Sequence, residues 1–273
     1  MDSNRIRVPD FKKMKRRAEK ITMLTAYDAT MARLFDRAGL DAILVGDSLG
    51  MVVMGLDTTL PVTLDAMIHH TRAVSRGAER ALVIADMPFL TYQVTVADAV
   101  RNAGRLLQEG GAAAVKLEGG RPVIDVVRRL VDVGIPVMGH LGMQPQSVHQ
   151  VGGHKKRGTQ PQESDAILAD AADLEQAGAF AIVLEAIPAE LARAVTAQVE
   201  VPTIGIGAGP DCDGQILVSY DMLGLFDEFA PPFVKQYAKL GAEIVTATQA
   251  YIEDVHAGRY PLAPSRPVGA PTT

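Results

Sequence analysis

Charged and polar side chains follow several short apolar runs in this chain, and they could perform acid–base and metal chemistry. The residues concerned are Asp47, Ser48, Asp86, Lys116, Glu118, His140 and Glu185. If the runs are parallel strands of one barrel, their ends meet at a single rim, where barrel enzymes build their active sites. A single Asp after a strand is also a common helix N-cap, but capping alone does not explain so many such ends. The pattern therefore indicates an enzyme.

Asp47 and Asp86 end two apolar runs that would form neighbouring strands. Two carboxylates at one rim repel each other unless a cation lies between them, and the sequence places no Arg beside either one. Carboxylate oxygens without Cys or His pairs nearby favour Mg²⁺ over zinc. We therefore expect both residues to bind Mg²⁺, with Glu118 as a third ligand, directly or through water. The alternative is that the two Asp residues only cap helices.

Lys116 and Glu118 lie two residues apart in one apolar run. That spacing places both side chains on the same face of a strand. Inside a barrel this face is crowded and dry, so the Lys requires an anion as its partner. The anion comes from the protein or from a bound substrate, and in the purely structural alternative Lys116 pairs with Glu118.

Glu185 and His140 end two further runs. A carboxylate in apolar surroundings is a good proton acceptor, so Glu185 is a candidate general base, with a structural role as the equal alternative. His140 could hydrogen-bond a substrate oxygen or only a backbone group.

The elements that must position these residues alternate along the whole chain. We expect strands over 21–28, 41–47, 81–88, 112–120, 135–142, 179–186 and 201–209, and a short strand with a helical turn within 213–223. Helical spacing covers 29–39, 63–77, 96–111, 121–134, 164–178, 187–199 and 232–256, with Thr63 and Ser164 as N-caps. The count approaches eight βα units, so the sequence predicts an α/β fold, a single-domain (β/α)₈ TIM barrel over 1–273. A basic N-terminal arm over 1–20 and a Pro-rich C-terminal tail over 262–273 flank it.

Composition excludes several classes of protein. Hydrophobic residues make up 48% and charged residues 22% of the 273 residues, which is typical of a soluble globular protein. The net charge of -5 argues against a nucleic-acid partner, and no apolar run reaches the roughly 20 residues of a membrane helix. The cations of the N-terminal arm are expected to form the solvated face of an entry helix. Cys212 is the single cysteine, which predicts a reducing, cytoplasmic location.

Eight segments carry a more specific signal. They are TAYD (25–28), ILVGDSLGMVVMG (43–55), TLPVTLDAMIHHTRAV (59–74), ADMPFLTY (85–92), AVKLEGG (114–120), GHLGMQPQSV (139–148), AFAIVLEAIPAELA (179–192) and PTIGIGAGPDCDGQILV (202–218). In this order and with this spacing, from Ile21 to Pro261, the chain resembles the ketopantoate hydroxymethyltransferase family. The combination of GDSLGMV with VKLEGG is specific to that resemblance.

The resemblance implies a (β/α)₈ barrel that transfers a hydroxymethyl group from 5,10-methylenetetrahydrofolate to 2-oxoisovalerate (3-methyl-2-oxobutanoate), giving 2-dehydropantoate in pantothenate biosynthesis. It implies one Mg²⁺ per subunit at Asp47, Asp86 and Glu118. Asp47, Ser48, Asp86 and Lys116 match oxoacid-binding positions, Glu185 matches the proton acceptor, and His140 matches an active-site histidine. Members of the family form homo-oligomers, typically decamers.

A long connection over 143–163 follows the fifth expected strand, and loops of this length are usually functional or mobile. It contains several glycines, which permit hinge-like changes, and the cations Lys155, Lys156 and Arg157. We predict a mobile flap over the folate whose cations attract the folate's glutamate tail. The alternative is a solvated surface loop. The basic segment 154–157 departs from the pattern of the family.

Two rival functions remain. One is a Mg²⁺-dependent lyase or mutase of the phosphoenolpyruvate mutase and isocitrate lyase type, which often carries a nucleophilic Cys on a flexible loop. Cys212 follows the GIGAG turn and is not so placed. The other is a catalytically silent barrel that serves as a scaffold, which loss of Asp47, Asp86 or Glu185 would have supported. All three are present.

Overall fold

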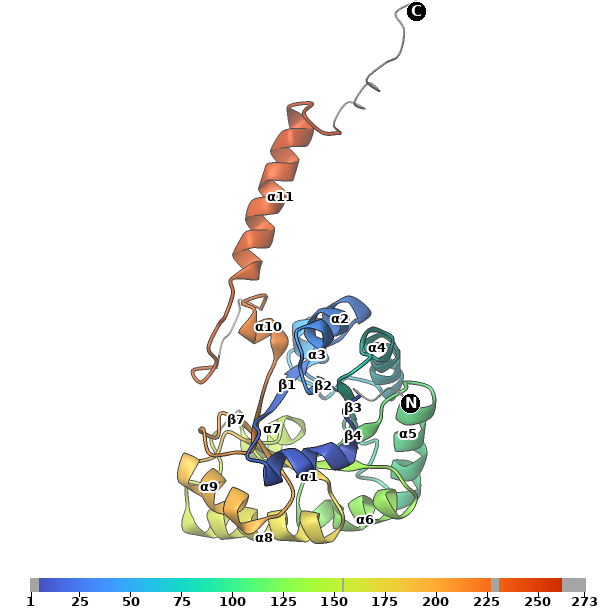
Figure 1. Cartoon of the computed structure of the whole chain (residues 1–273), viewed down its shortest axis with the longest axis vertical. Helices are drawn as coiled ribbons and strands as arrows, with labels where there is room; N and C mark the ends of the chain where they lie inside the picture. The colour runs from blue at the N-terminus through green and yellow to red at the C-terminus, as the bar shows by residue number, and fades with distance from the viewer. Residues whose placement is uncertain (1–4, 154, 227–230, 262–273) are drawn as a thin grey trace, which may run out of the picture. The chain divides into compact units, whose positions relative to one another are not determined.

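Eight parallel strands close into a barrel in the order β1 to β8. Figure 1 shows the chain with many of its strands and helices labelled. The computed structural model describes residues 5–153, 155–226 and 231–261. The strands are β1 Ile21–Thr25, β2 Ala42–Val45, β3 Leu82–Asp86, β4 Ala114–Lys116, β5 Val137–Gly142, β6 Ala181–Glu185, β7 Thr203–Ile206 and β8 Gly214–Leu217. The seam pairs β1 with β8, Ile21 opposite Gly214. The predicted (β/α)₈ TIM barrel is confirmed.

Helices precede β1, follow each strand from β1 to β6, and follow β8. They are α1 Val8–Arg16, α2 Ala29–Arg37, α3 Leu49–Val52, α4 Leu64–Gly77, α5 Val96–Gln108, α6 Ile124–Asp132, α7 Val148–Val151, α8 Pro161–Gln176, α9 Ala189–Gln198, α10 Ser219–Met222 and α11 Leu240–His256, with the 3₁₀ turns η1 Arg121–Val123 and η2 Pro145–Ser147. In α5 the Thr95 side chain accepts from the backbone N–H of Asp98, and Ala99, Ala103 and Leu106 are buried. This spacing of three to four residues gives the helix one apolar face.

Several predicted boundaries differ from the structure. Thr63 is the N-cap of α4, as predicted. Ser164 does not cap α8, because the helix already begins at Pro161, a residue suited to the first turn since it needs no hydrogen-bond acceptor for an N–H. Ser164 Oγ instead donates to the carbonyl of Gly158 at 3.0 Å. The helix expected from residue 232 begins only at Leu240.

The chain divides into two compact units, one ending at Ser219 and the other beginning at Tyr220. The first unit contains the barrel. In the second, α11 has no buried residue. None of the helices in the described ranges is long and apolar enough to cross a membrane. The predicted Pro-rich tail over 262–273 lies outside the described residues, as do residues 1–4 of the predicted basic arm.

The barrel interior is filled by apolar side chains, and α1 belongs to the same core. Phe11 of α1 is fully buried among inward-facing residues of the strands, including Ile21, Met23 and Ile84. Lys15, expected to be solvated, is not: Nζ pairs with Asp213 at 3.0 Å and its side chain is only 16% exposed. The arm therefore contributes to the core as well as to the surface.

Candidate active site

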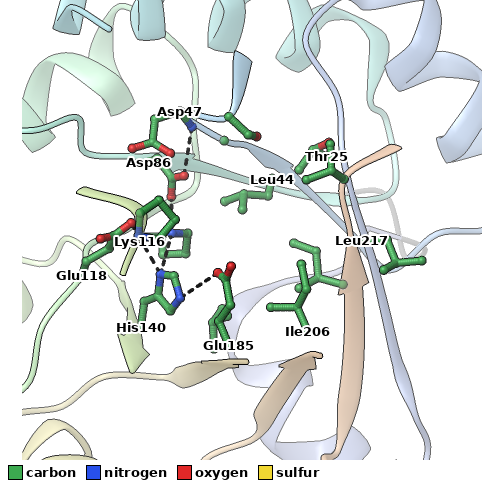
Figure 2. Close-up of a pocket in the computed structure, with 16 residues that line it drawn as sticks. Thr25, Leu44, Asp47, Asp86, Lys116, Glu118, His140, Glu185, Ile206 and Leu217 are labelled. Carbon is green, nitrogen blue, oxygen red and sulfur yellow. Dashed lines mark hydrogen bonds and ion pairs between the residues drawn. The ribbon is translucent and has the colours of Figure 1, made fainter. Parts of the chain in front are cut away.

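A cavity of about 100 Å³ lies at the carboxyl ends of the strands, and Figure 2 shows the side chains around it. Its lining contains all seven residues singled out from the sequence: Asp47, Ser48, Asp86, Lys116, Glu118, His140 and Glu185. They come from β2 to β6 or from the residues that directly follow those strands. The structure thus brings together every predicted site residue.

Strand periodicity explains why four of these side chains point inward. Each stands two residues after a side chain of the barrel core, and a separation of two keeps the same face of a strand. The pairs are Ile84 and Asp86, Ala114 and Lys116, Met138 and His140, and Val183 and Glu185. The layer of apolar side chains that fills the barrel is therefore followed by a layer of ionisable ones.

Asp47 and Ser48 reach the same cavity from the turn after β2. The inward position there is Gly46, where an added Cβ would lie 2.9 Å from Ser48 Oγ and 3.5 Å from Asp86 Oδ2. A larger residue at position 46 would therefore push the Ser48 side chain out of its place. The backbone N–H of Asp47 donates to Asp86 Oδ2 at 3.0 Å, and Ser48 Oγ lies 2.9 Å from the hydroxyl of Tyr27.

Lys116 is the cation at the centre of the site. Its Nζ lies 2.9 Å from Asp86 Oδ1, and both side chains are almost fully buried. Burial by itself would lower the pKa of Lys116, but the charges of Asp86, Glu118 and Asp47 outweigh it and raise the pKa above its usual range. Lys116 is therefore a permanent cation. The protein does supply an anion for Lys116, but the anion is Asp86, so the alternative of a structural ion pair between Lys116 and Glu118 is wrong and Asp86 is not unpaired.

The ionised forms of two carboxyl groups, Asp47 and Glu118, are destabilised in the site. Burial, and then the negative charge of Asp86, raise the pKa of Asp47 to about 7. Burial, and then the charge of Asp47, also raise the pKa of Glu118 well above its ordinary value. The cavity is lined by four carboxyl groups, those of Asp47, Asp86, Glu118 and Glu185, but by one Lys. A second cation in the site would therefore be electrostatically favourable.

His140 links Lys116 to Glu185. Its Nδ1 lies 3.3 Å from Lys116 Nζ, and its Nε2 lies 3.1 Å from Glu185 Oε2. Burial, followed by the charge of Lys116, lowers the pKa of His140, so the ring is neutral at pH 7. An ammonium group can only donate, so Nδ1 accepts and the ring proton is on Nε2, the nitrogen beside the Glu185 carboxylate. This tautomer orients the Glu185 carboxylate.

Sequence reasoning missed two residues of the site, Gln146 and Tyr92. Gln146 Nε2 donates to Asp47 Oδ2 at 2.9 Å, and its backbone N–H donates to Glu118 Oε2 at 3.1 Å. The Tyr92 hydroxyl donates to Gln146 Oε1 at 2.8 Å and accepts from the backbone N–H of Glu118 at 3.1 Å. Both residues lie in segments that carry the family resemblance, 85–92 and 139–148, but neither was singled out there, and Gln146 also lies in the unusually long connection.

The long connection after β5 is partly ordered into η2 and α7. Of its predicted cations, Arg157 pairs with Glu163 at 3.1 Å, and the backbone N–H of Arg157 donates to the carbonyl of Ala186. Lys155 and Lys156 are exposed. His154 lies outside the described residues.

The opposite wall of the cavity is apolar. It is formed by Ile206, Ile216, Leu217 and Val218, and Leu44 and Val183 of the barrel core also line the cavity. The cavity therefore has one charged side, from β2 to β6, and one hydrocarbon side. It is suited to a small anion with a branched alkyl group.

The donor set fits a hard divalent cation. The expected ligands Asp47, Asp86 and Glu118 offer only carboxylate oxygens, which Mg²⁺ prefers, and a cation would offset the cost of burying them. In the described residues, no three His, Cys, Asp or Glu side chains are already gathered at metal-binding spacing. Lys116 instead holds Asp86. The site thus contains the oxygen ligands that a metal ion prefers, but these ligands are not arranged around one common position.

Comparison with known proteins identifies the family to which the chain belongs. The family model described as ketopantoate hydroxymethyltransferase matches residues 5–263. The 3-methyl-2-oxobutanoate hydroxymethyltransferase of Moorella thermoacetica is 59% identical over 94% of this chain and 96% of its own. The enzyme of the same name from Syntrophus aciditrophicus is 57% identical over 91% of each chain.

Two solved structures of low sequence identity resemble this chain in fold. A 2,3-dimethylmalate lyase of the PEP mutase/isocitrate lyase superfamily has a TM-score of 0.60 at 19% identity, covering 95% of this chain and 90% of its own. A phosphonopyruvate hydrolase has a TM-score of 0.62 at 12% identity, covering 93% and 88%.

Proposed function

Because the chain belongs to the ketopantoate hydroxymethyltransferase family and is an enzyme of that kind, we propose that it transfers a hydroxymethyl group from 5,10-methylenetetrahydrofolate to 2-oxoisovalerate, giving 2-dehydropantoate for pantothenate biosynthesis. The observation that supports this substrate is the cavity, which has a charged side and an apolar side. Its charged side suits the carboxylate and keto oxygens of the oxoacid. Its apolar side suits the isopropyl group.

Different residues of the cavity have different roles in the proposed reaction. Lys116 binds an oxygen of the oxoacid and stabilises the negative charge that develops on the enolate. Glu185, oriented by His140, takes the proton from C3 of the oxoacid. The C3 carbanion then bonds to the methylene carbon of the folate as one of its two carbon–nitrogen bonds breaks, and the oxygen of water replaces the second nitrogen. The proton taken by Glu185 and one proton of the water go to the two nitrogens, and tetrahydrofolate leaves.

Asp47 and Asp86, with Glu118, would hold Mg²⁺, one ion per subunit. When bound, the ion acts as a Lewis acid on the keto group, which is worth several kcal/mol, as an order of magnitude. The excess of buried carboxyl groups supports this arrangement, because Lys116 alone cannot offset the charges of Asp47, Asp86 and Glu118.

The decisive test is an assay of the purified protein with 2-oxoisovalerate, methylenetetrahydrofolate and Mg²⁺, scored for 2-dehydropantoate by mass spectrometry. Omitting either substrate should abolish the product. A lyase or mutase of the rival type would cleave or rearrange its substrate without folate. Cys212 does not support that rival, since it is fully buried and burial raises the pKa of its thiol.

We predict that the connection after β5 contributes to folate affinity. Lys155→Ser with Lys156→Ser should raise KM for a polyglutamylated folate a few-fold at low salt, since exposed ion pairs contribute about 0–1 kcal/mol each. Arg157 is left unchanged because it pairs with Glu163. The measurement is KM for the polyglutamate and monoglutamate forms at two ionic strengths. An equal rise for both forms would contradict attraction of the glutamate tail.

We also propose a homo-oligomer, in keeping with the decamers expected for the family. The support is helix α11, which exposes apolar residues. Ile244, Ile252 and Val255 are 55%, 45% and 43% exposed and lie on one face of the helix. Ile244→Glu with Ile252→Glu should shift the sedimenting species toward the 29.1 kDa of one subunit, because each charge would be buried unpaired in an apolar contact. The neutral control is Glu253→Gln. A wild type that already sediments as one subunit would refute the assembly.

A reducing, cytoplasmic location accords with the single free cysteine. The net charge of -5 gives no support for a nucleic-acid partner.

A further inference from the structure

We propose that Gln146 is a positioning residue that fixes the Asp47 carboxylate for metal binding, and this proposal rests on the Mg²⁺-dependent function proposed above. Gln146 lies in η2, in the connection after β5, and only 6% of it is exposed. It is distant in sequence from both strands whose ends it contacts. Its bond to Asp47 spans 99 residues and its bond to Met87 spans 59.

The carboxamide of Gln146 makes all four hydrogen bonds that an amide side chain can make. Nε2 donates to Asp47 Oδ2 at 2.9 Å and to the carbonyl of Met87 at 3.0 Å. Oε1 accepts from the Tyr92 hydroxyl at 2.8 Å and from Gln93 Nε2 at 3.1 Å. The side chain therefore cannot rotate without losing several bonds at once, and its orientation is fixed.

A fixed amide gives the two oxygens of Asp47 different roles. Oδ2 is held by Gln146, whereas no hydrogen bond within the described residues reaches Oδ1, which leaves that oxygen for a cation. The backbone N–H of Gln146 also donates to Glu118 Oε2 at 3.1 Å. One residue thus contacts two of the three carboxylates expected to hold the metal.

The chemical type of Gln146 matters as much as its size. Glu in this position would direct a fifth carboxylate at Asp47, and an apolar residue would leave Asp47 Oδ2 and the Tyr92 hydroxyl without their bonds to the amide. Groups that orient metal ligands in this way typically contribute 10- to 100-fold, as an order of magnitude, to metal affinity or activity.

The test uses Gln146→Met, which keeps the length of the side chain and removes all four hydrogen bonds. We expect the Kd for Mg²⁺, measured by isothermal titration calorimetry on metal-free protein, to rise about 10- to 100-fold. The same change at exposed Gln108, Gln108→Met, is the matched control and should leave Kd at the wild-type value. A residue that only packs the loop would lower Tm without changing Kd. An unchanged Kd in folded Gln146→Met therefore overturns the proposal.

Tyr92→Phe is the second variant and serves if Gln146→Met does not fold. It retains the ring and Gln146 but removes the hydroxyl, which donates to Oε1 and accepts from the backbone N–H of Glu118. Kd should therefore rise by at least about 2- to 10-fold, the value of one hydrogen bond. An unchanged Kd in this variant would contradict the orienting network. Calorimetry requires no turnover. A wild type that binds Mg²⁺ but forms no 2-dehydropantoate would therefore refute the proposed function and leave the comparison of Kd values valid.

Discussion

Glu185→Gln is expected to stop the exchange of the C3 proton of 2-oxoisovalerate with deuterated water. Removal of a general base typically costs about 10²- to 10⁴-fold, and no other carboxylate is equally placed to replace it. Asp86 is paired with Lys116, whereas Glu185 Oε2 lies 3.1 Å from His140 Nε2 and its side chain remains 15% exposed. Gln can still accept the His140 proton, so the geometry of the ring is retained.

The exchange is followed by NMR with Mg²⁺ present and folate absent, because deprotonation does not require the one-carbon donor. Binding of 2-oxoisovalerate should survive in Glu185→Gln, which separates loss of the base from loss of the site. Glu190→Gln, in the first turn of α9, is the control with the same change outside the cavity. Exchange at the wild-type rate in Glu185→Gln would assign the base to another group.

Removal of divalent cations is expected to abolish turnover, and Mg²⁺ is expected to restore it. Asp47→Asn should raise the Kd for Mg²⁺ by at least 10-fold, as an order of magnitude, since it deletes a charged ligand. The variant should not destabilise the metal-free protein. The pKa of Asp47 is raised to about 7 in the folded state, so its ionised form opposes folding and stability falls as pH rises toward 7. Asn removes this penalty and still accepts from Gln146.

Asp86→Asn makes an instructive comparison, because it should weaken Mg²⁺ binding in the same way but lower stability. It leaves buried Lys116 without its nearest partner, and breaking a buried ion pair costs up to about 3–5 kcal/mol. Thermal unfolding of both variants without metal, at pH 8, measures the difference. Full activity after exhaustive chelation would contradict the metal requirement, and equal loss of Tm in the two variants would contradict the ion-pair assignment.

The gathering of the site could be predicted from the sequence because it depends on two simple periodicities. Parallel strands deliver their ends to one rim, and a step of two residues keeps one face, so Asp86 and Lys116 could be expected near each other. The identity of the partners could not be predicted. Asp86 pairs with Lys116 because β3 and β4 place them in register, and register between strands is set by the packing of the whole barrel.

Gln146 illustrates what a pattern of strands and helices cannot supply. Its place depends on the path of an irregular connection, and Gln in a loop has no periodicity that could distinguish it from its neighbours Gln144 and Gln150. The burial of Lys15 was missed for a similar reason. A Lys on an amphipathic helix is usually solvated, and only the closed barrel shows that its ammonium group meets three backbone carbonyls and Asp213.

The seam between β1 and β8 also determines when this protein becomes an enzyme during its synthesis. Thr25 and Ser219, which hydrogen-bond beside the seam, are 194 residues apart, so the cylinder cannot close until nearly the whole first unit has left the ribosome. Every charged group of the cavity is made earlier, between residues 47 and 185. A nascent chain therefore carries these carboxylates on an open sheet with two unpaired edges. Such long-range pairing is slow to form, and unpaired strand edges in folding intermediates are prone to aggregate.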